Sequence, residues 1–71
     1  MKIKIKNYPA LVREVRRQLN MSQEDLAHEL GVSFATVNRW ENGRTKPSKL
    51  AAAQIDAFCA RMTRRGLLSL P

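Results

Sequence analysis

The sequence predicts an all-α domain, and three observations carry this prediction. Apolar residues recur at helical spacing through most of the chain. Serines stand before two of these stretches, at Ser22 and Ser33, where their hydroxyls can cap a helix. Glycine or asparagine follows each stretch, as is typical of helix ends. With 71 residues, of which 44% are hydrophobic, the chain is long enough for one compact core but not for two.

The first 20 residues divide into an extended segment and a helix. Residues 1–8 are expected to form a short strand or a basic extended arm, because lysine and isoleucine alternate with period two within residues 1–6. A helix is predicted from Pro9, whose missing N–H would have no partner at a helix start. The apolar positions of this helix are Leu11, Val12, Val15 and Leu19.

Two short helices follow. Ser22 is predicted to cap the first of them by accepting a hydrogen bond from the N–H of Asp25. That helix is expected to end at Gly31, which tolerates the positive φ of a C-terminal turn. Ser33 begins the next helix, predicted over about residues 34–41.

The last part of the chain is predicted to be a loop, a helix and a tail. A polar loop over residues 44–47 leads to an alanine-rich helix over about 48–62. Residues 63–71 are expected to form an apolar tail. The helical domain therefore spans residues 9–62.

The stretch from Gln23 to Trp40 has the pattern of two helices that cross at a tight turn. Ala27 is small enough for two backbones to approach, and Gly31 permits a left-handed turn. Val37 is a branched side chain that fills the space where the second helix leans on the first. Together these positions predict a helix-turn-helix, with Trp40 in the core.

Residues 22–27 (SQEDLA), 31–33 (GVS) and 37–44 (VNRWENGR) resemble the phage Cro/repressor-like (XRE-type) helix-turn-helix family. The resemblance covers about residues 9–62. It implies a compact lambda-repressor-like DNA-binding domain of four to five helices. In this family the second helix crosses the DNA backbone and the third lies in the major groove.

The resemblance also implies roles for individual residues. The expected base-reading residues are Ser33, Phe34, Ala35, Asn38 and Arg39. The expected phosphate-binding residues are Gln23, Thr36, Asn42, Gly43, Arg44, Thr45 and Lys46, with the N–H groups around Gly43 included. The resemblance further implies a structural ion pair between Arg16 and Glu41.

The base-reading positions depart from the best-known phage members, which often carry glutamines there. Phe34 and Ala35 cannot hydrogen-bond a base, but they can pack on thymine methyl groups. Polar readout would then fall to Asn38, which suits adenine, and to Arg39, which suits guanine or a phosphate.

The charge of the chain favours a polyanionic partner. Thirteen Lys and Arg residues against six Asp and Glu give a net charge of +7. Residues 1–20 and 43–71 each carry six basic residues against one acidic residue, whereas residues 21–42 carry one basic against four acidic. This layout favours nucleic acid, with an acidic membrane face as the second possibility.

Several other classes are excluded by composition. No apolar run approaches the roughly 18–20 residues that span a bilayer, and no signal peptide is expected. One cysteine and one histidine offer no internal disulfide, zinc site or catalytic set. We therefore expect no enzyme, no metal and no cofactor, and a cytoplasmic location. The family resemblance implies that this location is of prokaryotic or phage type.

The predicted function is sequence-specific binding of double-stranded DNA by a small transcriptional regulator, a repressor or autoregulator. One alternative is a DNA-docking module of a larger modification, toxin–antitoxin or mobile-element system. Another is a protein- or RNA-binding helical domain that has lost base readout.

A homodimer on a pseudo-palindromic site is expected, because one module of this size binds DNA weakly. Residues 1–6 could pair as strands between subunits, or lie as a basic arm along phosphates. The tail, residues 67–71, offers exposed apolar surface as a second candidate interface. Phe58 and Met62 belong either to the core or to such an interface.

Overall fold

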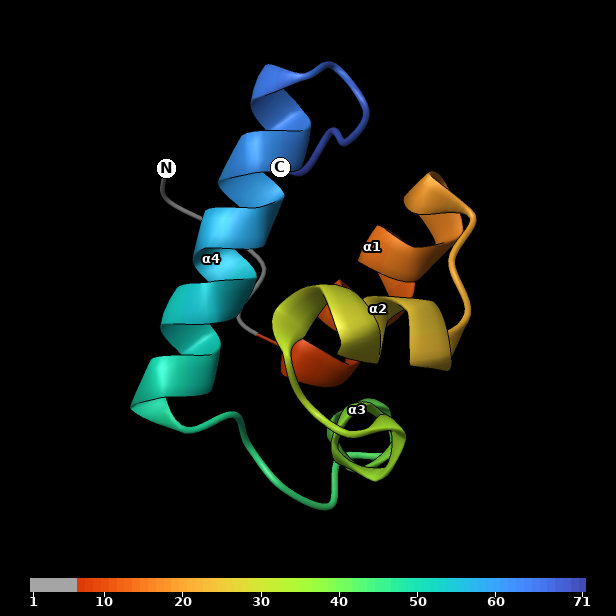
Figure 1. Ribbon diagram of the computed structural model, residues 1–71, viewed down its shortest axis with the longest axis vertical. Coiled ribbons are helices and arrows are strands. Elements are labelled where there is room, and N and C mark those ends of the chain that lie inside the picture. The colour runs from red at the N-terminus through yellow and green to blue at the C-terminus, as the bar shows by residue number, and fades with distance from the viewer. Residues whose placement is uncertain (1–6) are drawn as a thin grey trace.

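The computed structural model describes residues 7–71, which contain four helices joined by loops and followed by a tail (Figure 1). The helices are α1 (Tyr8–Leu19), α2 (Gln23–Leu30), α3 (Phe34–Glu41) and α4 (Lys49–Arg64). The predicted all-α class is thus confirmed. The interpretation of residues 1–6 as a strand or arm lies outside the described residues.

The first helix begins one residue before the predicted Pro9. The side chain of Asn7 caps it by accepting a hydrogen bond from the N–H of Ala10 at 3.3 Å, so Tyr8 already lies in the helix. The helix ends at Asn20, which adopts the left-handed conformation with φ 55°.

The second helix begins and ends as predicted, and for the predicted reasons. Ser22 Oγ accepts from the N–H of Asp25 at 3.0 Å, and the Asp25 carboxylate accepts from the N–H of Ser22 at 3.0 Å. These reciprocal bonds form a capping box. The hydrogen bond from the backbone of Ser22 lowers the pKa of Asp25. At the other end, Gly31 has φ 71°, a left-handed conformation that glycine adopts without strain and that, apart from Asn and Asp, other residues rarely adopt.

The helix α4 forms one side of the molecule, and α3 lies at the end where α4 begins (Figure 1). The core lies between the helices and consists of one cluster of buried side chains. Its members are Leu11, Val12, Val15, Leu26, Ala27, Leu30, Val37, Trp40, Ile55, Phe58, Cys59, Met62 and Leu68. Phe58 and Met62 are therefore core residues and not an exposed interface. Among the described residues, no helix is long and apolar enough to cross a membrane.

The tail exposes less apolar surface than predicted, because two of its three leucines pack against the core. It turns back from the end of α4 toward the body of the molecule (Figure 1). Leu68 is buried at 4% exposure and Leu70 packs partly buried against the core, while Leu67 stays exposed. Gln18 on α1 holds this arrangement, because its side-chain amide donates to the carbonyl and accepts from the N–H of Ser69, both at 2.8 Å. A core this small needs the additional apolar cover that the tail provides.

Candidate nucleic-acid interface

A buried carboxylate connects α1 to α3. Glu41, the last residue of α3, is only 4% exposed, and both of its carboxylate oxygens accept hydrogen bonds from Arg16. The distances are 2.5 Å from Nε and 2.8 Å from the terminal nitrogen. Arg13 donates a hydrogen bond to the backbone carbonyl of Glu41. The structure thus brings together Arg16 and Glu41, the pair that the family resemblance implies.

Opposing effects act on the ionisation of this pair. Burial raises the pKa of Glu41, but hydrogen bonds from Arg16 and Gln23 and the positive charges of Arg16 and Arg13 outweigh it and leave the pKa below its ordinary 4.5. The same hydrogen bonding raises the pKa of Arg16. Both groups are therefore charged across the physiological pH range.

Three side-chain amides continue the network from Glu41 toward the surface. Gln23, the first residue of α2, donates to Glu41 Oε1 at 3.1 Å. Asn38 on α3 donates to Gln23 Oε1 at 3.1 Å, and its own oxygen accepts from Asn42 at 3.0 Å. The network fixes the start of α2 against α3. Sequence reasoning missed these contacts, although the spacing of four residues between Asn38 and Asn42 is one at which helical side chains meet.

The outward residues of α3 differ in how freely they can reach a partner. Ser33, Phe34, Ala35 and Arg39 are exposed, as expected for a surface that reads bases. Asn38 is half-buried, and both ends of its amide have partners within the chain.

Thr36 is half-buried as well and lies beside the cap of α3. Its backbone N–H donates to Ser33 Oγ at 3.1 Å, and the two hydroxyls lie 2.9 Å apart. Either hydroxyl can be the donor of this bond, so the Thr36 hydroxyl is free to donate to a phosphate when Ser33 donates to it.

The loop after α3 is exposed over residues 42–46. Gly43 has φ 71°, and its N–H donates to the carbonyl of Trp40 at 3.1 Å. The N–H of Arg44 donates to the carbonyl of Arg39 at 2.9 Å. This corrects one expectation, because these two N–H groups close the turn and are not free for a phosphate. The loop offers its side chains instead.

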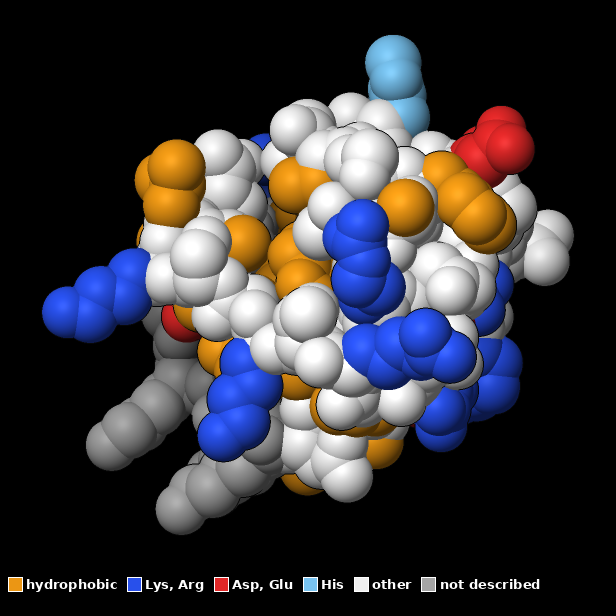
Figure 2. Space-filling view, turned by 90° about the horizontal axis from the view of Figure 1, so that it is seen from below, with side chains coloured by type: hydrophobic (Ala, Val, Ile, Leu, Met, Phe, Trp, Pro, Cys, Tyr) orange, Lys and Arg blue, Asp and Glu red, His pale blue; other side chains and the backbone are white. Residues whose placement is uncertain are grey.

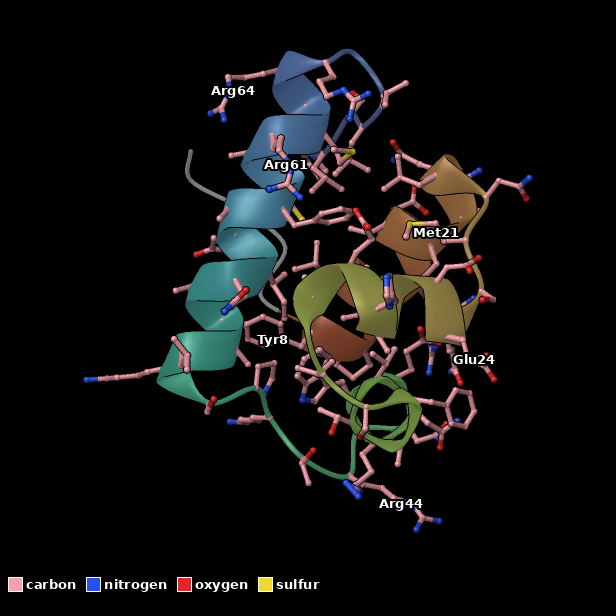
Figure 3. All side chains as sticks on the ribbon, viewed as in Figure 1. Tyr8, Met21, Glu24, Arg44, Arg61 and Arg64 are labelled. Carbon is pink, nitrogen blue, oxygen red and sulfur yellow. The ribbon has the colours of Figure 1, made fainter. Side chains whose placement is uncertain are left out.

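Basic side chains gather around the end of the molecule formed by α3. Figure 2 views the molecule from below Figure 1 and shows several lysine and arginine side chains on this face, with carboxylates only near its edges. Arg44 points away from the body below α3, whereas Arg61 and Arg64 lie toward the far end of α4 (Figure 3). Within residues 7–71 the ion pairs involve Arg16 and Arg17, so the cations of the α3 end have no carboxylate partner in that range.

The described residues offer little for other chemistry. Within residues 7–71, no group of three or more His, Cys, Asp or Glu side chains could hold a metal ion. Cys59 is fully buried, and burial raises the pKa of its thiol to about 11. The buried thiol therefore acts as an apolar core group.

Comparison with known proteins identifies related sequences. A family model described as Helix-turn-helix (HTH_3) matches residues 12–60. A type II methyltransferase of Lactococcus lactis subsp. cremoris, M1.ScrFI, is 43% identical over 51 residues, and M.SsoII of Shigella sonnei, also a type II methyltransferase, is 42% identical over 45 residues. An uncharacterized HTH-type transcriptional regulator of Methanothermobacter thermautotrophicus (strain Delta H) is 42% identical over 45 residues.

These matches cover unequal shares of the proteins compared. The match to M1.ScrFI covers 68% of this chain but 13% of the methyltransferase, and the match to M.SsoII covers 59% of this chain but 12% of that protein. The match to the regulator covers 63% of this chain and 65% of the regulator. No solved structure matches the chain.

Proposed function

This chain belongs to the helix-turn-helix family of DNA-binding domains, and from that premise we propose that it recognises specific sequences in double-stranded DNA as a small transcriptional regulator. The observation that carries the proposal is the surface at the α3 end. There Arg39 on α3 and Arg44 and Lys46 in the loop after it lie beside the other exposed side chains of α3. These three cations have no carboxylate partner among residues 7–71. Such a surface combines charge for affinity with side chains for readout.

In this proposal α3 enters the major groove and its neighbours hold the phosphates on either side. Ser33, Phe34, Ala35 and Arg39 face the base edges, with Asn38 behind them. The phosphates are contacted by the side chains of Gln23, Thr36, Asn42, Arg44, Thr45 and Lys46. Gln23 lies at the start of α2, where the positive end of the helix dipole also favours a phosphate. Because the amide network already ties Gln23 to α3, phosphate contact and readout share one rigid frame.

We further propose that the chain acts as a homodimer on a pseudo-palindromic site. A single module buries roughly 600–1,000 Å² on DNA and binds weakly. Half-sites one helical turn apart lie about 34 Å from one another. The longest Cα extent of the described chain is 29 Å, so two copies fit side by side on one face of the duplex. The proposed place of action is the cytoplasm of a prokaryotic cell.

A second candidate function is a DNA-docking module within a larger modification system. It is favoured by the two methyltransferases, in which the matching region is only 13% and 12% of the protein. In such a protein the chemistry would belong to the rest of the chain. A regulator must bind its site tightly by itself, whereas a docking module needs the attached enzyme for occupancy.

Selection from random duplex DNA at near-physiological salt tests the proposal. The expected result is an inverted repeat, bound by two copies of the chain in sedimentation. Enrichment of a single half-site bound by one copy would favour the docking module. Equal binding to all sequences would refute sequence-specific recognition.

Charge variants test the proposed phosphate contacts. Arg44→Ala should weaken binding to all duplexes and reduce the slope of log K against log salt by about one for each subunit. Arg64→Ala removes the same charge at the far end of α4, so it serves as the matched control (Figure 3). Equal effects of the two substitutions would show that net charge matters and the proposed contact does not.

A further inference from the structure

We infer that the first turn of α3 recognises the C5-methyl group of a pyrimidine, so that this chain binds best to sites with thymine or 5-methylcytosine under that turn. The inference rests on the proposed function and specifies which base feature is read. Its starting point is Phe34, the first residue of α3, whose side chain is large, apolar and 49% exposed.

The polar groups of this turn are engaged with one another. Ser33 Oγ accepts from the N–H of Thr36 at 3.1 Å, and the hydroxyls of Ser33 and Thr36 lie 2.9 Å apart. The side chains of this turn that make no bond inside the chain are the ring of Phe34 and the methyl group of Ala35, both exposed. Neither can donate or accept a hydrogen bond, but both can pack on a methyl group.

The amide in the next turn of α3 is already partly engaged. Asn38 donates to Gln23 at 3.1 Å and accepts from Asn42 at 3.0 Å, so these bonds hold its side chain and leave one N–H and one oxygen lone pair for a base. Arg39 is exposed and has no ion-pair partner within residues 7–71. The side chains of α3 that are exposed and have no hydrogen-bonding or ion-pair partner within residues 7–71 are therefore one guanidinium group and an apolar patch.

The surroundings of Phe34 favour a base edge over the DNA backbone. A shallow hollow beside the ring is lined by Ala27, Val32 and His28, and by the carboxylates of Glu24 and Asp25. Their negative charge disfavours a phosphate at the ring itself. In the major groove the only apolar group of a standard base pair is the thymine methyl, and 5-methylcytosine carries the same group at the same ring position.

The test begins from the selected duplex and changes one methyl group at a time. One arm replaces each thymine by deoxyuridine, and the other replaces each cytosine by 5-methylcytosine. At the positions under α3, loss of a methyl should weaken binding about fourfold per half-site, and gain of one should strengthen it by a similar factor. Other positions should not respond. The two arms show which of the two pyrimidines the site uses.

Variants then connect the methyl effect to the ring. Phe34→Ala should lose most of the difference in affinity between duplexes with and without the methyl, while Phe34→Leu keeps a larger apolar contact and should retain more of it. Leu67→Ala is the matched control, since Leu67 is 51% exposed and belongs to the tail, which lies at the end of the molecule away from α3 (Figure 1). Circular dichroism checks that each variant is folded.

Two results would overturn the inference, and they differ from failure of the proposed function. Specific binding that is insensitive to every methyl change would refute methyl recognition alone, as would an undiminished methyl effect in Phe34→Ala. Absence of any enriched sequence in the selection would instead refute both.

Discussion

Removal of the Glu41 carboxylate should destabilise the fold more than its sequence position at a helix end would indicate. Glu41→Ala leaves the guanidinium of Arg16 without its partner and deprives Gln23 of an acceptor. Breaking a fully buried ion pair costs about 3–5 kcal/mol. The Arg16 side chain remains 25% exposed and can regain water, so we expect about 2–3 kcal/mol here.

Thermal and urea denaturation measure this effect directly. A domain of 71 residues has a free energy of unfolding of about 4–10 kcal/mol, so Glu41→Ala should stay folded at 25 °C. Its midpoint temperature should fall by roughly 10–20 °C. Glu14→Ala is the matched comparison, because Glu14 also accepts two hydrogen bonds from an arginine, Arg17, at 2.9 and 2.6 Å. That pair lies at the surface, where water screens it, so the loss should be much smaller.

The pH dependence gives an independent test of the same carboxylate. The pKa of Glu41 in the folded state lies below its ordinary 4.5. Its contribution to stability is therefore complete above pH 4.5 and is lost as the pH falls through the folded-state pKa. The stability difference between the wild type and Glu41→Gln should be large at pH 7 and should shrink on acidification below 4.5.

Two results would refute this reasoning. The first is equal loss of stability in Glu41→Ala and Glu14→Ala. The second is a double-mutant cycle of Arg16→Ala and Glu41→Ala with a coupling energy below about 0.5 kcal/mol, which would show that the two groups act independently.

Three further predictions concern the core and the turn. Trp40→Ala, at 2% exposure, should cost about 3–5 kcal/mol in urea denaturation, while Trp40→Phe should cost clearly less; equal costs would argue against a packing role. Gly31→Ala should cost about 1–2 kcal/mol, because alanine is strained in the left-handed conformation. A steric clash does not contribute, since no atom lies within 4 Å of an added Cβ, and a neutral result would contradict this assignment of strain. Cys59, with its thiol pKa raised to about 11, should react with a thiol reagent at pH 7 only when urea unfolds the chain, and rapid reaction of the native protein would show that the thiol is accessible.

The helix ends are the part of the fold that local sequence determined. The capping box of Ser22 and Asp25 and the left-handed turn at Gly31 depend on atoms within a few residues of one another. The same holds for the start of α3 at Ser33. Such bonds depend on residues close together in the sequence, so the sequence predicted these ends correctly. The end of α4 at Arg64, two residues beyond the prediction, lies where no strong local stop precedes Gly66.

Contacts between distant segments were decided only by tertiary packing. Ser69 lies 51 residues from Gln18, and no local pattern indicates that its backbone would pair with that amide and bring Leu68 into the core. Likewise, the sequence placed Asn38 on the outward side of α3, but the crossing of α2 and α3 brought Gln23 within 3.1 Å of it. Local sequence thus determined where the helices lie and which residues are candidates for DNA contact. Which of those candidates remain free was decided by the crossing of the helices, because each amide can satisfy its hydrogen bonds inside the chain once its partner is brought near.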